Sequence, residues 1–508
     1  MREGVQKKQR AHPVGMAGTI CRVAPTAFHH VHAMPQTSFT SSERTLLWLV
    51  AMGFFMQSLD GTIVNTALPS IAASMQESPL RMQTAVVAYA LTMAAVIPAS
   101  GWLADRFGTR RIFMTAAAVF ALGSLACALS TNLGMLIGAR VLQGLGGALL
   151  LPVGRLAVLR SFPKGKFLEA MSFVAIPGLM GQLIGPTLGG VLVQVASWHW
   201  IFLINVPVGL LGALAALRWM PDLRDAKVGP LDGAGFLMLT MAMVCMSLSL
   251  DGLGGLGFRH VTVLVLLIAG LAALTAYWLH AHKVAKPLFH PQLFSVQSFR
   301  VGILGNLFAR IGSGAMPYMI PLLMQLSMGF SPAQAGMMML PMALASMGIK
   351  PLATRLIHHF GYRWVLTGNT LVLGAMIMGF ALMTQGQPLW LRIVQMALFG
   401  AVNSVQFTCM NTVTLKDLEP HQASSGNSML SMVQMLAMGM GVAVAAALIA
   451  GFQQWLGVAD VHASSDAFRG AFVCIGIITM LSAWVFWQLE SDRAQLDPSA
   501  VEPDREDH

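Results

Sequence analysis

Charged side chains are scarce in this sequence. Asp, Glu, Lys and Arg make up 10% of the 508 residues, whereas soluble domains carry about 25%. Hydrophobic residues make up 56% of the chain. This balance excludes an ordinary soluble protein and predicts an integral membrane protein. In a membrane protein, the net charge of +10 matters through the loops that hold it and does not indicate nucleic-acid binding.

Cysteine is also rare, and the catalytic patterns of enzymes are missing. The five cysteines are scattered, and four of them lie inside apolar runs, so they show neither a disulfide framework nor metal-ligand spacing. The apolar runs contain no paired carboxylates and no nucleophile with a base, which counts against an enzyme. We expect no cofactor and no metal site. The cluster of His29, His30 and His32 is either a metal ligand set or part of a solvated tail, and we favour the tail.

Long apolar runs are what the sequence has in abundance. A helix needs about 20 apolar residues to cross a bilayer, and fourteen such runs occur. They are 46–68, 82–104, 112–130, 133–155, 168–194, 199–220, 232–251, 260–281, 300–326, 333–357, 363–384, 388–415, 424–450 and 468–489. The connections are short, so the chain has little room for a separate soluble domain.

The distribution of Lys and Arg predicts the orientation in the membrane. With a cytoplasmic N-terminus, the outside loops hold little beyond Arg81, Arg259 and Arg469, and most other loop Lys and Arg residues lie inside. This asymmetry follows the positive-inside rule. An even number of spans then returns the C-terminus to the cytoplasm, and we expect a bacterial inner-membrane protein.

The two ends of the chain are polar. Residues 1–44 form a basic tail without a cleavable signal, which we expect to be disordered, and 491–508 form a cytoplasmic tail. Met1 or Met34 can be the true start. We favour Met34, and mass spectrometry of the native N-terminus distinguishes the two.

An internal repeat divides the chain. "DRFGTRRIF" (105–113) joins spans two and three, and "HHFGYRWVL" (358–366) joins spans ten and eleven. The repeat predicts an all-α fold with two six-helix bundles, at 45–220 and 291–490, around a two-helix insert at 221–290. Parallel repeats of this kind characterise one major class of secondary transporter.

Asp60 is the only acidic residue near the middle of a span. A carboxylate at that depth costs about 2.5–3.5 kcal/mol and favours a functional role. On a helical wheel, Met52, Met56, Leu59 and Ile63 form a stripe suited to lipid, so Asp60 is expected to face protein or a water-filled cavity. Asp60 and Arg140 each lie about 12 Å from the outer ends of their helices, and they can meet. The pair either fixes helix packing permanently or opens so that Asp60 takes up a proton.

Arg310 is a second cation near the middle of a span. It is either a structural arginine bonded to carbonyl groups or a cavity residue that binds an anionic or zwitterionic substrate. The other polar candidates for a substrate cavity are Gln57, Asn65, Gln143, Asn403, Gln406, Asn411, Asn427 and Gln434.

Five motifs, in order, resemble those of the major facilitator superfamily, in its fourteen-helix drug/proton antiporter branch. They are "LDGTIVNTALP" (59–69), "GWLADRFGTRR" (101–111), "RVLQGLGGA" (140–148), "GQLIGPTLGG" (181–190) and "SWHWIFLINVPVG" (197–209). The resemblance covers about residues 45–490. "SWHWIFLIN", "FARIGSGAMP" and "NTVTLKDL" are similar to the bacterial family labelled multidrug resistance transporter D.

The resemblance implies roles for two motifs. The loop residues Gly101, Asp105, Arg106, Gly108, Arg110 and Arg111 would form a conformational latch, beside their simpler role as topology anchors. We expect Gly101 and Gly108 to allow a close approach of helices there. The residues Gly181, Gly185, Pro186, Gly189 and Gly190 would form the antiporter motif of exporters. His199 departs from the branch pattern, which has Arg between the two tryptophans, and it is either a pH sensor or an interface residue.

These observations favour a proton-coupled exporter of small molecules, acting as a multidrug antiporter by alternating access. The alternatives are a dedicated metabolite or organic-anion exporter and a transport-inactive membrane sensor. The expected partners are a small-molecule substrate, protons and membrane lipid, without nucleic acid, and we expect a functional monomer.

Overall fold

The structure, a computed structural model, describes residues 39–162, 164–224, 229–254, 260–284, 287–419, 422–457 and 465–489. Most of the predicted tail 1–44, all of the tail 491–508, the histidine cluster and Met34 lie outside the described residues. Every helix below belongs to the unit of the chain that begins at Thr40.

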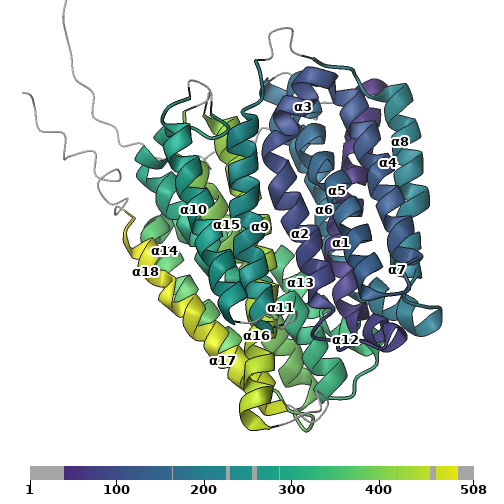
Figure 1. Cartoon of the computed structure of the whole chain (residues 1–508), viewed down its shortest axis with the longest axis vertical. Coiled ribbons are helices and arrows are strands. Elements are labelled where there is room, and N and C mark those ends of the chain that lie inside the picture. Colours follow the sequence, from purple (N-terminus) through teal and green to yellow (C-terminus); the bar gives the residue numbers. More distant parts are fainter. Residues whose placement is uncertain are drawn as a thin grey trace, which may run out of the picture. The chain divides into compact units, whose positions relative to one another are not determined.

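The helices form two six-helix bundles and an inserted pair (Figure 1). The first bundle contains α1 (Ser41–Met75), α2 (Gln83–Val96) with η1 (Ile97–Ala99) and α3 (Ser100–Phe107), α4 (Thr109–Ala128), α5 (Leu133–Ser161), α6 (Lys164–Val195), and α7 (Trp200–Leu203) with α8 (Asn205–Trp219). The insert is α9 (Gly233–Gly254) and α10 (His260–Ala281). The second bundle contains η2 (Pro291–Ser295), α11 (Gln297–Leu322) with η3 (Leu323–Ser327), α12 (Pro332–Met338), α13 (Leu340–Gly348), α14 (Lys350–Gly379) with η4 (Phe380–Leu382), α15 (Leu389–Leu415), α16 (Ala423–Leu456), and α17 (Ser465–Leu481) with α18 (Ala483–Trp487). The predicted all-helical fold is confirmed, and the residue limits set for its domains stay a prediction.

Thirteen helical segments of the described residues are long and apolar enough to cross a membrane, and each corresponds to one predicted span, with bounds that differ by up to eight residues. The exception is the predicted span 333–357, which is divided among α12, α13 and the start of α14. Pro341 and Pro351 lie in the first turns of α13 and α14. Proline lacks the N–H that continues a helix and clashes with the preceding turn, so the span is broken at each of them. The boundary with the next span is Gly361, whose φ of 75° suits glycine.

The insert lies against both bundles. Helix α9 packs on α2 of the first bundle and on α16 of the second, and α10 packs on α9. At the start of α9, Asp232 accepts a hydrogen bond from the Gly235 N–H at 2.9 Å and contacts His280 Nε2 of α10 at 2.7 Å. The carboxylate also accepts from the Leu288 N–H, in the segment that leads to α11. Burial alone would raise the pKa of Asp232, but these hydrogen bonds together lower it.

Helix α1 lies inside the first bundle, which corrects the expected lipid-facing stripe. Only Met52 of that stripe is exposed, and Met56, Leu59 and Ile63 are buried. The reason is that α6 packs along α1. The apolar stripe therefore faces a protein neighbour, and the periodicity of one helix does not tell lipid from protein.

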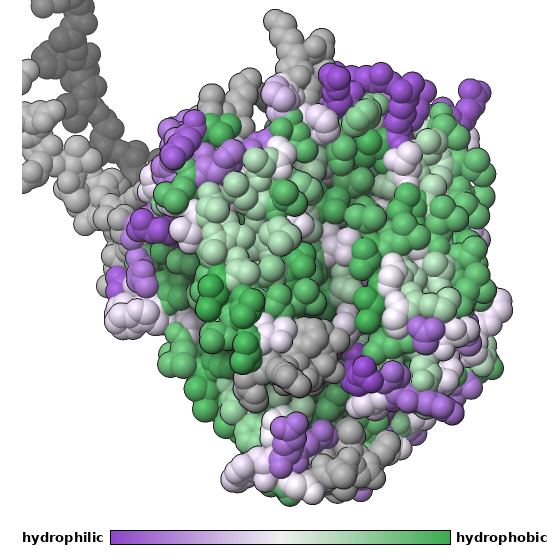
Figure 2. All heavy atoms as spheres, viewed as in Figure 1, coloured by the Kyte–Doolittle hydropathy of each residue, from purple (hydrophilic) through white to green (hydrophobic). Residues whose placement is uncertain are grey.

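The two ends of the helices are named here after the predicted orientation. The inner end carries Asp105 and Arg160, and the outer end carries Met75 and Asn132. Figure 2 shows apolar side chains over the middle of one face, with hydrophilic residues gathered toward the two ends. This pattern suits a protein whose middle zone faces lipid.

Candidate functional site

Asp60 is the centre of a buried hydrogen-bond network between α1, α5 and α8. Arg140 Nη1 donates to Asp60 Oδ2 at 2.7 Å. Gln143 Nε2 and Asn205 Nδ2 both donate to Asp60 Oδ1, at 2.8 and 3.1 Å. The side chain of Asp60 is 0% exposed and that of Arg140 is 1% exposed. One cation and two amides therefore stabilise a carboxylate that is closed off from the surrounding solvent.

A second layer of contacts holds Arg140 and Gln143 in place. Arg140 Nη1 also donates to Gln143 Oε1 at 2.6 Å, and its Nε donates to the Ala85 carbonyl at 3.4 Å. The Arg140 guanidinium lies 4.1 Å from the centre of the Tyr89 ring, close enough for a cation–π contact. Gln143 Nε2 donates to Ser124 Oγ of α4 at 2.7 Å. These partners offset the desolvation cost of burying two charges. The Coulomb attraction between the charges rarely compensates for that cost alone.

The sequence around Arg140 explains why these groups converge. Arg140 and Gln143 are three residues apart and share one face of α5. The glycines that follow let neighbouring helices approach. A Cβ atom on Gly144 would lie 2.9 Å from Thr92 Cβ of α2, and one on Gly146 would lie 2.6 Å from the Ala116 carbonyl oxygen of α4. The motif thus combines two polar residues with the small residues that bring helices close in lipid.

The structure brings together three of the predicted site residues, Asp60, Arg140 and Gln143. Gln143 was expected in the substrate cavity, but its amide is used inside the network. Sequence reasoning missed Asn205 and Ser124. Asn205 was quoted in a motif without a role of its own, although an amide within an apolar run is a detectable signal. Ser124 is a small hydroxyl in a helix, and nothing in the sequence separates it from a serine bonded to its own helix.

Arg310 lies on α11, half-buried, and has no acidic partner in the described part of the chain. Its Nη2 donates to Asn306 Oδ1 at 3.3 Å, and its guanidinium lies 4.5 Å from the centre of the Phe407 ring. Its Nε has no hydrogen-bond partner. The partners are an amide and an aromatic ring, and not the backbone carbonyls of the structural alternative. Sequence reasoning missed Arg155 of α5, whose buried Nε is also without a partner.

The remaining cavity candidates divide into two groups. Gln406 is enclosed, because it donates to Thr370 Oγ1 at 2.7 Å and accepts from Asn369 Nδ2 at 2.8 Å. Gln434 donates to Asn411 at 2.7 Å and so joins α16 to α15. The others keep unused polar atoms or are half-buried: Gln57 Oε1 and Asn65 Oδ1 are buried without a partner, and Asn403 and Asn427 are half-buried.

The predicted latch loop bonds within the first bundle. Asp105 pairs with Arg160 Nη2, at the inner end of α5, at 2.6 Å. Arg110 donates to the Met220 carbonyl, and the side chains of Arg106 and Arg111 are exposed. Gly108 has φ of 93°, and a Cβ atom there would collide with Asp222. The expectation for Gly101 is wrong, because a Cβ atom on it would meet nothing within 4 Å.

The predicted antiporter motif is a seam of small residues. Cβ atoms on Gly181 and Gly189 would lie 2.6 and 2.5 Å from the carbonyl oxygens of Phe55 and Ile63, and one on Gly185 would collide with Thr62, all on α1. A Cβ atom on Gly190 would instead collide with the Pro332 carbonyl of α12. Thr66 donates to the Pro186 carbonyl at 3.1 Å. The motif therefore joins α6 to α1 and to the second bundle.

Hydrogen bonds that join the two bundles lie toward the outer end. Gln325 Nε2 donates to the Thr66 carbonyl at 2.9 Å, and Thr187 Oγ1 donates to the Gly336 carbonyl at 3.1 Å. Tyr318 and Gln83 also contact each other there, at 3.5 Å. Close to this end, His199 stacks on Trp198 with ring centres 3.7 Å apart.

Two helix bundles around an inserted pair, with a buried ion pair in one bundle, are an architecture of multi-pass secondary transporters. The chain belongs to the Major Facilitator Superfamily, whose family model matches residues 50–442 and 303–506. A protein of Serratia proteamaculans (strain 568), described as "Putative multidrug resistance protein MdtD", is 49% identical over 453 residues, or 89% of this chain and 95% of that protein. The protein of the same description from Escherichia coli O81 (strain ED1a) is 47% identical over 461 residues, or 90% of this chain and 97% of that protein.

Solved structures share the fold at low sequence identity. A bacterial homologue of the human lysosomal transporter Spinster, in an inward-facing and occupied conformation, has a TM-score of 0.64 at 14% identity and covers 89% of this chain and 97% of its own. The D-xylose–proton symporter has a TM-score of 0.63 at 15% identity, with 88% and 98% covered. At such identities the likeness shows the fold alone.

Proposed function

We propose that this transporter exports small molecules across the bacterial inner membrane in exchange for protons, as a multidrug antiporter, with both termini in the cytoplasm. The observation that carries the proposal is Asp60, fully buried and bonded to Arg140, Gln143 and Asn205. An ionisable residue inside the membrane is by default a candidate for a functional residue, and a carboxylate there is a candidate proton site. The prevalence of Lys and Arg at the inner end supports the orientation.

The proposed cycle depends on the partners of Asp60. With Arg140 beside it, Asp60 is held as a carboxylate. When a conformational change draws Arg140 away, or when a bound substrate leaves the site, burial disfavours the charge and Asp60 takes up a proton. Return of the guanidinium, or binding of a substrate, expels the proton. The two amides keep the oxygen of Asp60 in place during the exchange.

Alternating access needs two states, one closed at the outer end and one closed at the inner end. The contacts at the outer end stabilise the first of them. The bonds of Gln325 to Thr66 and of Thr187 to Gly336 close this end. They must break when the outer side opens. The pairing of Asp105 with Arg160 at the inner end is then the latch contact that changes in the opposite state.

The energetics permit export against a gradient. Moving one charge across 100 mV supplies about 2.3 kcal/mol, and a tenfold concentration ratio costs about 1.4 kcal/mol. One proton therefore supports a ratio of about fortyfold.

The test is transport by the purified protein in proteoliposomes, driven by an imposed pH gradient. We expect wild type to move a cargo compound against its gradient and Asp60→Asn to bind the compound without accumulating it. Gradient-driven accumulation by Asp60→Asn would refute the proposed role of Asp60.

One observation favours a second candidate, the export of organic anions. Arg310 and Arg155 carry interior cations without an acidic partner in the described residues, and such groups suit an anionic ligand. Deletion of the gene followed by metabolite profiling and a drug-resistance panel separates the two candidates. Accumulation of a carboxylic or phosphorylated metabolite, with unchanged drug resistance, would favour the anion exporter.

A further inference from the structure

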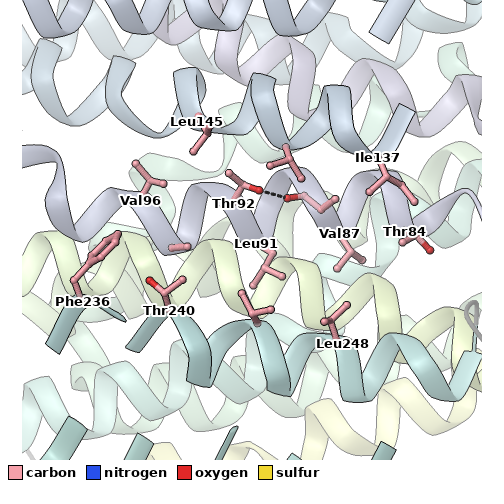
Figure 3. A pocket seen from close by; sticks show the side chains of 14 residues that line it. Thr84, Val87, Leu91, Thr92, Val96, Ile137, Leu145, Phe236, Thr240 and Leu248 are labelled. Carbon is pink, nitrogen blue, oxygen red and sulfur yellow. Dashed lines mark hydrogen bonds between the residues drawn. The ribbon is translucent and has the colours of Figure 1, made fainter. Parts of the chain in front are cut away.

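A crevice lies between the first bundle and the insert. Figure 3 shows it between α2, α5 and α9, and it encloses about 470 Å³, within the range of ligand pockets in proteins. Its wall is almost wholly apolar. It is lined by Thr84, Val87, Ala88, Leu91, Thr92, Ala95, Val96, Ile137, Val141, Leu145, Phe236, Thr240, Val244 and Leu248.

The crevice runs along the span formed by α2, η1 and α3 from its outer end to about its middle, and along α9 from near its outer end to within three residues of its start. The lining residues extend from Thr84 to Val96 on α2, and from Leu248 to Phe236 on α9. Each stretch spans twelve residues, or about 18 Å at 1.5 Å per residue. The hydrocarbon core of a bilayer is about 30 Å thick, so the crevice has the depth of one leaflet. Val141 and Leu145 are among the exposed hydrophobic residues, and the lipid surrounding the helices therefore reaches this region.

A polar group without a partner marks the outer end of the crevice. Thr84 is 8% exposed, and its Oγ1 is buried without a hydrogen-bond partner. Deeper in the crevice, the hydroxyl of Thr92 is satisfied by the Ala88 carbonyl at 2.7 Å, whereas Thr240 Oγ1 is also buried without a partner. A buried hydroxyl that lacks a partner costs free energy, and Thr84 lies where the hydrocarbon core meets the polar headgroup zone.

We infer that the crevice between α2, α5 and α9 binds an acyl chain of an outer-leaflet phospholipid, whose ester oxygen accepts a hydrogen bond from Thr84 Oγ1. The acyl chain fills an apolar space of one leaflet's depth. Its ester group is the polar group nearest to the hydrocarbon. The lipid thereby becomes part of the packing between the insert and the first bundle.

Photo-crosslinking tests the inference. The full-length protein is reconstituted with a phosphatidylethanolamine that carries a diazirine in one acyl chain, irradiated, and mapped by peptide mass spectrometry. We expect adducts at Val87, Val141 and Val244, on the three walls, and native mass spectrometry should show a retained phospholipid mass.

Two pairs of variants make the test specific. Ala88→Phe fills the crevice and should abolish the adducts, whereas Ala272→Phe, on the exposed face of α10, should leave them unchanged. Thr84→Val keeps the shape and removes the hydroxyl, and it should weaken labelling about twofold to tenfold. Thr240 Oγ1 is also without a partner, but it lies beside the hydrocarbon chain, which offers no acceptor, so Thr240→Val should leave the labelling unchanged.

Three results would overturn the inference. Adducts spread evenly over all exposed helix faces would show that the lipid contacts the protein non-specifically, as part of the surrounding bilayer. Equal labelling of Ala88→Phe and wild type would place the lipid elsewhere. A retained mass that is not a phospholipid would make the crevice a site for another ligand, such as a lipophilic cargo molecule.

Discussion

The carboxylate of Asp60 accepts more hydrogen bonds than a purely structural ion pair needs. Two amides, Gln143 and Asn205, bond the same oxygen, and Arg140 bonds the other. If Arg140 withdraws, the two amides still hold Asp60 in position. The charge then loses most of its stabilisation while the geometry persists, and this suits a group that exchanges protons.

At this scale the stability of the pair can be measured. Arg140→Gln leaves the Asp60 charge buried without its cation, and breaking a buried pair costs about 3–5 kcal/mol. The double variant Asp60→Asn/Arg140→Gln removes both charges and should recover much of the loss. Thermal unfolding of the purified proteins in detergent measures this. A double variant less stable than Arg140→Gln would show that the unpaired charge of Asp60 is not what destabilises the single variant.

How much of the site could be predicted depends on the kind of residue. A lone carboxylate and a lone arginine at matching depths stand out in apolar runs, so the meeting of Asp60 and Arg140 could be inferred from helix geometry. The roles of Asn205 and Ser124 could not be predicted in this way. Asn205 reaches Asp60 because α8 packs against α1, and Ser124 reaches Gln143 because α4 packs against α5, and sequence spacing does not reveal either contact. The unsatisfied Nε of Arg155 appears only once its neighbours are known.

At the scale of helices, small residues decide which elements touch. The glycines of α6 let it lie along α1, and this contact buries the apolar stripe of α1 that periodicity alone assigned to lipid. Likewise the predicted span 333–357 could be recognised by its composition, but its division into α12, α13 and the start of α14 follows from Pro341 and Pro351. Hydropathy reports the length of a span and does not report its continuity.

The seam between α6 and α1 gives a prediction for this scale. In Gly189→Ala the new methyl group meets the Ile63 carbonyl 2.5 Å away, and backbone cannot move aside easily. We expect a loss of about 1–3 kcal/mol, seen as a lower unfolding temperature and lower transport. The matched control is Gly138→Ala on α5, where a Cβ atom meets nothing within 4 Å. Because alanine favours helix more than glycine does, the control should be neutral or slightly stabilised, and equal effects at both positions would contradict the packing argument.

At the scale of the whole molecule, the bonds between bundles lie toward the outer end, and the repeat of "DRFGTRRIF" and "HHFGYRWVL" predicts a two-bundle fold without saying which end is closed. The closed end depends on side-chain contacts between distant segments, such as Gln325 with Thr66. Two conformations of one sequence differ by only a few kcal/mol, and sequence patterns cannot rank them.

The contact of Gln325 with Thr66 can be removed selectively. Gln325→Ala loses a hydrogen bond between the bundles, and a bond worth about 1 kcal/mol shifts a two-state equilibrium about fivefold. We expect a membrane-impermeant thiol reagent, added from the outer side, to label Asn65→Cys faster in this variant, in a background without the native cysteines. Gln385→Ala is the control, because Gln385 bonds Ser327 within the second bundle. Equal labelling rates in the two variants would show that the contact does not hold the outer end closed.

Substrate-triggered proton release tests the central claim most directly. Purified wild type and Asp60→Asn are mixed with a ligand library in weakly buffered detergent solution, and the pH change is recorded together with binding. The account predicts that a cargo compound displaces protons from wild type and binds Asp60→Asn without releasing them. Equal proton release from both proteins would contradict it, because the coupling carboxylate would then lie elsewhere in the chain.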